Sequence, residues 1–405
     1  MKKLLILGAS IDQLSAYQLA KKKGLYIIAV DGDPNALCFK FANEHFVISI
    51  MDLPKLLDFV QWYSKKSKID GVMTMGIDIP HIAATLARKL NLPEIPALET
   101  AKTATNKFLM RKRWQEKGIP IPWFCEITTI DELKKVIKKR GYPVIIKPQD
   151  GRGSRGVLLI RKGVGLGWAF AETLKFSFNK RLLVEEYLQG PQISTESILY
   201  DDFATTPGFV DRNYNMIERL APRIIENGGE TPSILLEKDQ GAIVSLVEKA
   251  ARALGVKRGV AKGDAVLTVD GPKMIEMAVR LSDKSFSGGF IPYSIGVDIV
   301  DPVIDMTLGL KPKLIKLKPK FGPFGVVSRY FFPQPGKFIG VRGLNEVKKW
   351  NWIKWLDFYI KRGARINIPR HHSERLGGFM VVGKDREEAV KRAELVLQTI
   401  QLITR

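Results

Sequence analysis

The stretch KGDAVLTVDGPKMIEMAVR, residues 262–280, reads as two β-strands joined by a tight Asp-Gly-Pro turn. Alternate residues of a strand point to opposite faces, so Glu276 and Arg280 share one face of the second strand. Lys262 and Asp264 likewise share a face of the first strand, and in an antiparallel hairpin the two faces can lie opposite each other. Two carboxylates and two cations on paired strands favour a Mg²⁺–phosphate site, because Mg²⁺ binds few protein carboxylates and completes its shell with phosphate and water.

The segment Tyr142–Ile160 predicts a second hairpin. A strand that ends near Lys147 leads into the run DGRGSRG, residues 150–156, and then into another apolar strand. Three glycines in seven residues let backbone N–H groups approach a ligand, and Arg152 and Ser154 add hydrogen-bond donors. The loop is therefore predicted to bind a polyphosphate. The loop opens no helix and lacks the Gly-Lys-Ser/Thr ending of a Walker P-loop. A tight turn with solvated arginines is the alternative interpretation.

The first hundred residues alternate short apolar runs with amphipathic stretches, beginning with Leu4–Leu7. This alternation predicts a parallel sheet with crossover helices. The turn Gly8–Ser10 lacks the three-glycine dinucleotide fingerprint, although Asp31 and Asp33 follow the second strand, where a ribose-binding acid often lies. The alternatives are a nucleotide site here and a doubly wound domain that supports a site built elsewhere. Downstream, the pattern predicts a helix over Thr103–Lys117, ended by glycine and proline.

The chain has 405 residues, enough for two or three domains, and a formal net charge of +22. Residues 311–365 hold 14 basic and two acidic residues and include Trp350, Trp352 and Trp355. Within this window Glu346–Lys361 is predicted to form an amphipathic helix that packs its tryptophans against the body of the protein. A nucleic-acid or anionic-surface binding protein is therefore the alternative class, although no standard nucleic-acid motif is present.

The cysteines and the hydropathy pattern bear on location. Cys38 and Cys125 lie far apart in the sequence and no histidines cluster near them, which argues against a disulfide framework or a zinc motif. A reducing, cytoplasmic location is expected. No apolar stretch approaches the roughly 20 residues needed to cross a bilayer.

The order and spacing of these motifs resemble the ATP-grasp superfamily, in the branch of biotin carboxylase, carbamoyl-phosphate synthetase and the ATP-dependent carboxylate–amine ligases. The resemblance covers essentially the whole chain. The segments that carry it are Asn106-Lys107, Pro143–Pro148, the glycine-rich hairpin, the connector Glu185–Leu188, Gly263–Arg280 and the strand-to-helix segment Gly377–Ala389.

The resemblance implies an α/β fold that is α+β in its ATP-grasp part. A pre-ATP-grasp, Rossmann-like domain with a doubly wound parallel sheet is expected at 1–98, followed by a two-lobed ATP-grasp fold. The N-lobe is expected at 99–188, including a mobile lid at 123–187, and the C-lobe with the Mg/ATP site at 189–310. A basic insertion and C-terminal subdomain would then occupy 311–405.

The same resemblance implies roles for individual residues. Asp264 and Glu276 would bind the metal, and Lys262 and Arg280 would be the catalytic cations, with Arg280 stabilising charge on the transferring phosphoryl group. The residues expected to bind ATP are Lys107, Lys147, Arg152, Gly153, Ser154, Gly156, Glu185, Glu186, Tyr187, Leu188, Gln192 and Glu196.

Two departures from the family pattern matter. Ala278 stands where many relatives have an asparagine, so water is expected to complete the metal shell. Gln192 stands where a ribose-binding glutamate often follows the connector, and Glu196 is the candidate substitute. The metal site is therefore expected to survive, while the ribose contact is the weaker assignment.

The implied activity is an ATP- and Mg²⁺-dependent ligation, with Mn²⁺ as the alternative metal. A small-molecule carboxylate would be activated as an acyl phosphate and attacked by an amine, with release of ADP and phosphate. A bicarbonate-dependent carboxylase of the same fold is the second enzymatic interpretation, and a homodimer without a nucleic-acid partner is expected. The candidate substrate contacts are Asp78, Arg219, Arg223, Ser287 and Gly288, whereas His371 and His372 are expected to be loop residues rather than catalytic bases.

Overall fold

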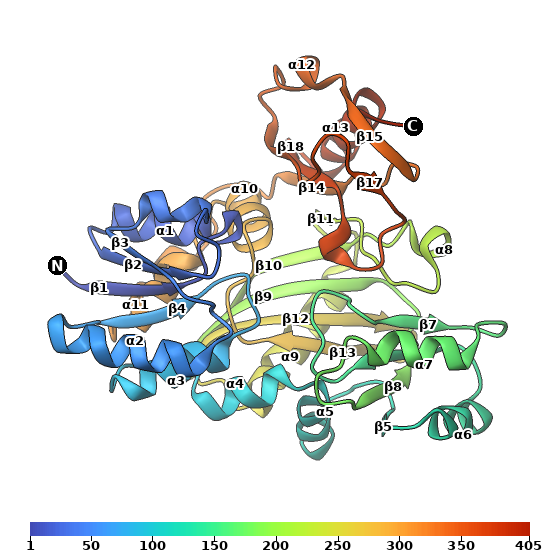
Figure 1. The fold of residues 1–405 in the computed structure, drawn as a ribbon, viewed down its shortest axis with the longest axis horizontal. Helices are drawn as coiled ribbons and strands as arrows, with labels where there is room; N and C mark the ends of the chain where they lie inside the picture. The colour runs from blue at the N-terminus through green and yellow to red at the C-terminus, as the bar shows by residue number, and fades with distance from the viewer.

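The computed structural model describes residues 1–405 and contains four β-sheets (Figure 1). The N-terminal sheet is entirely parallel and has the order β3-β2-β1-β4. Helix α1 packs on one face of this sheet, and α2 and α3 pack on the other. The doubly wound parallel sheet predicted from the sequence is therefore confirmed. Its elements are β1 (Lys3–Leu7), α1 (Leu14–Lys22), β2 (Tyr26–Asp31), β3 (Glu44–Val47), α2 (Leu53–Lys66), β4 (Gly71–Thr74) and α3 (Pro80–Lys89).

The acid at the end of β2 closes a turn of this domain. The Asp31 carboxylate accepts the backbone N–H of Ala9 at 2.7 Å, directly after β1. Its other oxygen accepts the N–H of Asp33 at 2.9 Å. These contacts favour a structural role for Asp31 over a nucleotide site.

A second small sheet, of order β5-β8-β6-β7, carries the glycine-rich loop. Strands β6 and β7 pair antiparallel with Val144 opposite Ile160, which confirms the predicted hairpin. Helices α6 and α7 pack on this sheet through a separate apolar cluster. The elements are β5 (Phe124–Ile127), α6 (Ile130–Arg140), β6 (Val144–Pro148), β7 (Leu158–Ile160), α7 (Leu166–Leu174) and β8 (Leu182–Glu186).

The central sheet has eight strands in the order β13-β12-β9-β10-β11-β14-β18-β16. Its first five strands are β9 (Gln192–Tyr200), β10 (Phe203–Arg212), β11 (Gly229–Thr231), β12 (Arg258–Thr268) and β13 (Gly271–Ala278). Helix α9 (Glu237–Ala253) packs on it with α5 through a shared apolar cluster. The remaining strands, β14 (Gly325–Tyr330), β16 (Ile353–Phe358) and β18 (Gly377–Gly383), lie beyond residue 310, so one sheet crosses the boundary expected there.

The C-terminal part adds helix α13 (Arg386–Thr399), which packs on β14 and β18. A three-stranded sheet of order β17-β15-β19 lies beyond it and is drawn in orange and red in Figure 1. Its strands are β15 (Gly336–Arg342), β17 (Arg365–Ile366) and β19 (Gln401–Thr404).

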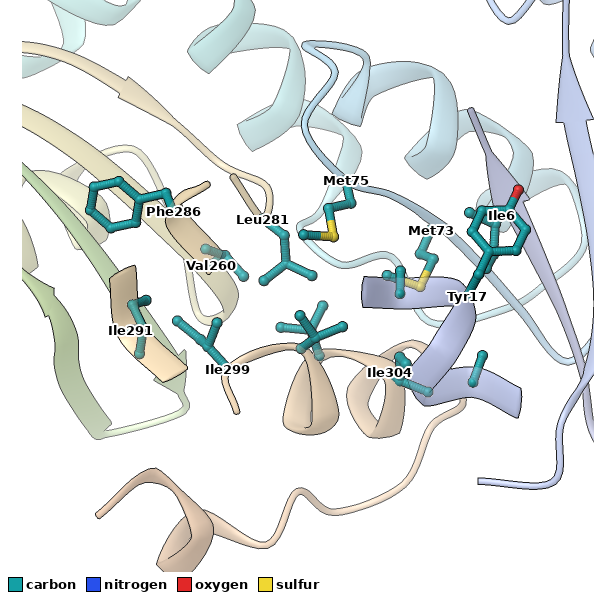
Figure 2. Packing of buried hydrophobic residues seen from close by; sticks show 14 of the residues in the cluster. Ile6, Tyr17, Met73, Met75, Val260, Leu281, Phe286, Ile291, Ile299 and Ile304 are labelled. Atoms are coloured by element: carbon teal, nitrogen blue, oxygen red, sulfur yellow. The ribbon is translucent and has the colours of Figure 1, made fainter. Parts of the chain in front are cut away.

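The largest apolar cluster joins the N-terminal domain to the central sheet (Figure 2). Met73 in β4 and Met75, directly after it, pack in the same cluster as Leu281 and Phe286, which follow β13. A backbone bridge between Met75 and Leu281 reinforces this contact. The packing therefore fixes the loop after β4 against the residues that follow the 262–280 hairpin.

Two predicted helices differ in the structure. The Thr103–Lys117 helix is two helices, α4 (Leu98–Thr105) and α5 (Lys107–Glu116), because Asn106 adopts an extended conformation and caps α5 through the N–H of Leu109. The Glu346–Lys361 helix is wrong: only the short helix α12 (Leu344–Val347) forms, and the chain then enters strand β16.

The physical reason for the second difference lies in β18. Strand β16 pairs antiparallel with β18, with Leu356 opposite Phe379. This long-range pairing outweighs the local preference for a helix. Trp350 and Trp352 stack at 4.8 Å between ring centroids in the connecting turn. None of the helices in the structure is long and apolar enough to cross a membrane.

Candidate active site

A cavity of about 650 Å³ lies where the glycine-rich hairpin, the β12–β13 hairpin, the loop after β4 and a C-terminal loop meet. Its wall includes both members of the predicted metal pair and the predicted phosphate-binding lysines. Most of the remaining predicted ATP-binding residues also line it, namely Arg152, Gly153, Ser154, Glu185, Glu186, Tyr187, Leu188 and Gln192. Most of the residues that the sequence assigned to one site therefore line one cavity in the structure.

Asp264 and Glu276 lie directly opposite each other on β12 and β13. The Lys262 amino group donates to Asp264 Oδ1 at 2.7 Å, and the Ser194 hydroxyl also donates to that carboxylate. Burial opposes ionisation of Asp264, but Lys262 and Arg212 outweigh it and hold the pKa of this carboxyl below its usual value. An ionised Asp264 beside Glu276 supplies two oxygen donors for a divalent cation.

Lys107 is the first residue of α5 and reaches over the metal pair. Its amino group donates to the carbonyl of Gly151 at 2.8 Å and lies 3.1 Å from a Glu276 oxygen. The capped start of α5 thus places this cation between the glycine-rich loop and β13.

Lys147 is buried in β6 and shares the carboxylate of Glu185 with Arg111. Arg111 donates to Glu185 Oε2 at 2.9 Å and to the carbonyl of Met274 at 2.8 Å. Burial opposes ionisation of Glu185, but the two cations outweigh it and lower its pKa. Burial also lowers the pKa of the Lys147 ammonium below its usual value. The Glu185 side chain thus serves this ion network, which the sequence did not predict.

The glycine-rich loop adopts left-handed backbone at Gly153 (φ +60°) and Ser154 (φ +59°). The first of these needs glycine's freedom, and the second is a strained position for serine. Gly156 does not line the cavity: a Cβ there would lie 3.0 Å from the Phe176 ring, so it serves close packing. The assignment of Gly156 to ATP is therefore a correction.

Glu196 is a second correction. It is fully buried in β9, where its carboxylate accepts the N–H of Ser282 at 2.6 Å and the Ser287 hydroxyl at 2.8 and 2.9 Å. Burial raises its pKa above the usual value. Glu196 does not line the cavity and cannot contact a ribose there, because it holds the loop after β13 in place.

Arg280 follows β13 and forms an ion pair with Asp78 of the N-terminal domain, with Nε 2.9 Å from the carboxylate. Burial opposes ionisation of Asp78, but Arg280 outweighs it and lowers its pKa. Both residues line the cavity. The N-terminal domain therefore positions a predicted catalytic cation.

Family models match two parts of the chain. Residues 104–283 match an ATP-grasp domain. This part of the chain is an ATP-grasp domain. Residues 329–405 match a model described as L-amino acid ligase C-terminal domain 2. The ATP-grasp match contains every residue predicted to bind ATP or metal, and the superfamily's carboxylate–amine ligase branch is the one expected from the sequence.

Among solved structures, the chain superposes on an L-amino acid ligase from Bacillus licheniformis with a TM-score of 0.85, at 22% identity over 100% of this chain and 99% of that one. It is 23% identical to an uncharacterized protein of Sinorhizobium fredii over 96% of this chain and 80% of that protein. It is also 23% identical to the carbamoyl phosphate synthase large chain of Thermomicrobium roseum, of which it spans only 28%.

Four of the predicted substrate contacts lie off the ATP-grasp cavity. Arg219 donates to the carbonyl of Phe332 at 3.3 Å, and the Arg223 guanidinium lies over the Trp168 ring at 5.8 Å. Ser287 is bound to the buried Glu196, and Gly288 packs against Ser15. The structure therefore does not bring these four residues into the cavity, and their substrate assignments stay predictions.

Sequence reasoning missed a polar cluster on the same wall, formed by Arg212, Tyr214, Glu226, Tyr330 and Arg375. These residues come from β10, the segment before β11, β14 and the loop before β18. Arg375 lies just before β18, and no local sequence pattern links it to the others.

His372 lies in the same loop as Arg375 and lines the cavity. Its backbone N–H donates to the carbonyl of Gly153 at 3.2 Å, and its ring Nε2 accepts the backbone N–H of Glu226 at 3.3 Å. Burial lowers its pKa well below the usual value, so the ring is neutral. His372 thus connects the glycine-rich hairpin to the C-terminal part of the sheet. These contacts favour a structural role for its side chain over that of a catalytic base.

Proposed function

We propose that this ATP-grasp enzyme joins the carboxylate of one amino acid to the amino group of a second. The observation that carries this proposal is the match of residues 329–405 to the L-amino acid ligase C-terminal domain, because this segment contributes Tyr330, His372 and Arg375 to the cavity. A generic ATP-grasp match would leave the acid and the amine open. The segment that distinguishes this subfamily here reaches the cavity itself.

The residues at the metal position fit a divalent cation. Asp264 and Glu276 offer two carboxylates on one face, and no group of three or more acidic, histidine or cysteine side chains is arranged so that it could hold a metal ion. Such a pair suits Mg²⁺, whose remaining ligands come from phosphate and water, and the same oxygen donors would accept Mn²⁺. When bound, the cation would neutralise charge on the ATP phosphates.

Side chains of this protein would carry the rest of the chemistry. Lys107 and Lys147 bind phosphate oxygens, and the 150–156 loop covers them with backbone N–H groups. A carboxylate oxygen of the acid component attacks the γ-phosphorus, and the bond to the β-phosphate oxygen breaks to release ADP. The amine nitrogen then attacks the acyl carbon, phosphate leaves, and the nitrogen loses its proton. Arg280, held by Asp78, faces the charge on the acyl phosphate.

The test is an ADP-release assay with purified protein, ATP, Mg²⁺ and pairwise mixtures of the twenty common amino acids. We expect ADP and phosphate to form with at least one pair, and hydroxylamine to trap an acyl hydroxamate. Formation of AMP and pyrophosphate would contradict the acyl-phosphate mechanism. ADP release that requires bicarbonate and no second amino acid would favour the carboxylase alternative.

The assembly and location of the enzyme belong to the same proposal. We expect a homodimer in the cytoplasm with no nucleic-acid partner. Analytical ultracentrifugation of the purified chain checks the oligomeric state, and a monomer at micromolar concentration would contradict it.

A further inference from the structure

The cavity has a second cationic wall, formed by residues to which the sequence motifs assign no role. Arg212, at the end of β10, donates to Glu226 Oε2 at 2.8 Å. Arg375, in the loop before β18, places its Nη1 3.2 Å from the same oxygen. Two guanidinium groups from distant parts of the chain therefore share one carboxylate at the cavity surface.

Both guanidinium groups keep unused donors. Arg212 Nε is buried and has no hydrogen-bond partner. Arg375 uses Nε for the carbonyl of His372 at 3.0 Å and Nη1 for Glu226, while its Nη2 donates to no protein group. The guanidinium carbon of Arg375 lies 3.5 Å from the centroid of the Tyr330 ring, and this cation–π contact helps to hold the group in place. A fixed fork with a free donor suits a planar carboxylate.

The close contacts of this wall leave room for one more anionic group. Its two arginines share a single carboxylate, Glu226, as their salt-bridge partner, and the neighbouring His372 ring is neutral because burial lowers its pKa. Burial raises the pKa of both Tyr214 and Tyr330 to about 12, so neither phenol is ionised near neutral pH. In direct contact, two guanidinium groups therefore share one carboxylate, and a bound carboxylate could pair with the donor that remains free.

We propose that Arg375, supported by Arg212, binds the carboxylate of the amine component, so that this component is an amino acid or peptide with a free carboxylate. The inference rests on the proposed function. The acid component loses its negative carboxylate when it is phosphorylated beside Asp264 and Glu276. The carboxylate of the amine component stays ionised throughout the reaction, and a permanent guanidinium can hold it in both steps.

An acidic group lies near Arg375, as a zwitterionic ligand requires. Asp283 lines the same cavity. Burial and the neighbouring Asp283 together raise the pKa of Asp12 to about 6, against the opposing effects of Lys284 and Arg375, so Asp12 lies near both Asp283 and Arg375. A bound amino acid would thus find a cationic and an anionic group within one region of the cavity.

The test measures binding without turnover. Calorimetry on the protein with a non-hydrolysable ATP analogue and Mg²⁺ compares each of the twenty amino acids with its amide. We expect the wild-type protein to bind at least one free amino acid more tightly than its amide. In Arg375→Ala the affinity for that amino acid should fall by roughly 10- to 100-fold, while affinity for the amide changes little.

Two further variants control for loss of folding and for nonspecific effects of removing an arginine. Arg375→Lys keeps the charge but loses the fork, so it should give an intermediate loss and serves if the alanine variant does not fold. Arg362→Ala removes an exposed arginine of the same C-terminal part and should change nothing. The inference is overturned if the wild type binds no free amino acid, or if both Arg375 variants keep the wild-type preference. Either result leaves ADP release, and hence the proposed function, to be judged by its own assay.

Discussion

Glu185 is the residue on which two buried cations depend, since Lys147 and Arg111 both bind its carboxylate. Glu185→Gln should leave these cations facing each other without a counter-charge. We expect the free energy of unfolding to fall by about 3–5 kcal/mol, as is typical when one partner of a buried ion network is removed. Urea denaturation near neutral pH measures this loss.

The matched control is Glu218→Gln, which removes an exposed pair with Arg161 whose two hydrogen bonds measure 2.6 and 2.7 Å. Solvent screens this pair, so stability should barely change. Equal losses in the two variants would show that burial of the Glu185 network does not determine its contribution.

Glu276 carries a prediction about activity instead. Glu276→Gln keeps the shape of the side chain but removes one of the two carboxylates of the metal pair, so ADP formation should fall by roughly 100-fold or more. Added Mg²⁺ should restore part of it. Glu248→Gln, on the exposed face of α9, is the control. Wild-type ADP formation by the Glu276 variant would remove the metal assignment.

The residue scale also shows how far sequence patterns reach. Period-two alternation predicted the Asp264–Glu276 face correctly because the hairpin is local. The family resemblance, which offered Glu196 as a ribose contact, could not show that its carboxylate binds Ser287, because that contact joins the central strand β9 to a loop far away in the sequence. Arg212 and Arg375 are far apart in the sequence, so only the assembled fold brings them together.

At the scale of elements, the start of α5 controls the position of Lys107. The Asn106 side chain accepts the N–H of Leu109 at 3.0 Å and caps the helix. Asn106→Ala should cost about 1 kcal/mol of stability and raise the KM for ATP, because the first turn that carries Lys107 would fray. Asn106→Ser, which can still cap, should retain both properties. Thermal denaturation and ATP titration measure the two effects, and an unchanged KM in the alanine variant would contradict the link.

The tryptophan-rich segment shows why element type was harder to predict than element position. Its apolar residues suit a helix, but they also suit a strand rich in aromatic and β-branched residues. The deciding contact is long-range, since Leu356 lies opposite Phe379 on β18. A partner strand that arrives later in the chain cannot be read from the segment itself.

At the scale of the whole molecule, the doubly wound N-terminal sheet followed directly from alternating patterns, whereas the crossing of residue 310 by the central sheet did not. Strands β14, β18 and β16 join β11 through pairings that span long intervals of sequence. This continuity explains how C-terminal residues such as Arg375 reach the cavity. The basic window of 311–365 thus supplies strands β14 and β16 to the central sheet, and its charge is carried mainly by exposed side chains.

That exposed charge leads to a prediction for the intact enzyme. Lys313, Lys318 and Lys320 are exposed, and their amino groups form no hydrogen bond or ion pair. The triple variant Lys313→Gln, Lys318→Gln and Lys320→Gln should keep kcat/KM for ATP within about 2-fold at 0.15 M salt, where charges are screened beyond roughly 8 Å. Steady-state ADP release at two salt concentrations checks this.

The same variant tests the alternative class of protein. We expect the wild-type chain to show no RNA binding at 0.15 M salt, because its basic surface lacks a fold that orients bases. Tight RNA binding that the triple variant loses, with ADP release intact, would instead make this surface a nucleic-acid site separate from the ligase cavity. Loss of ADP release at low salt alone would indicate that the surface attracts anionic substrate, since steering by charge weakens as salt rises.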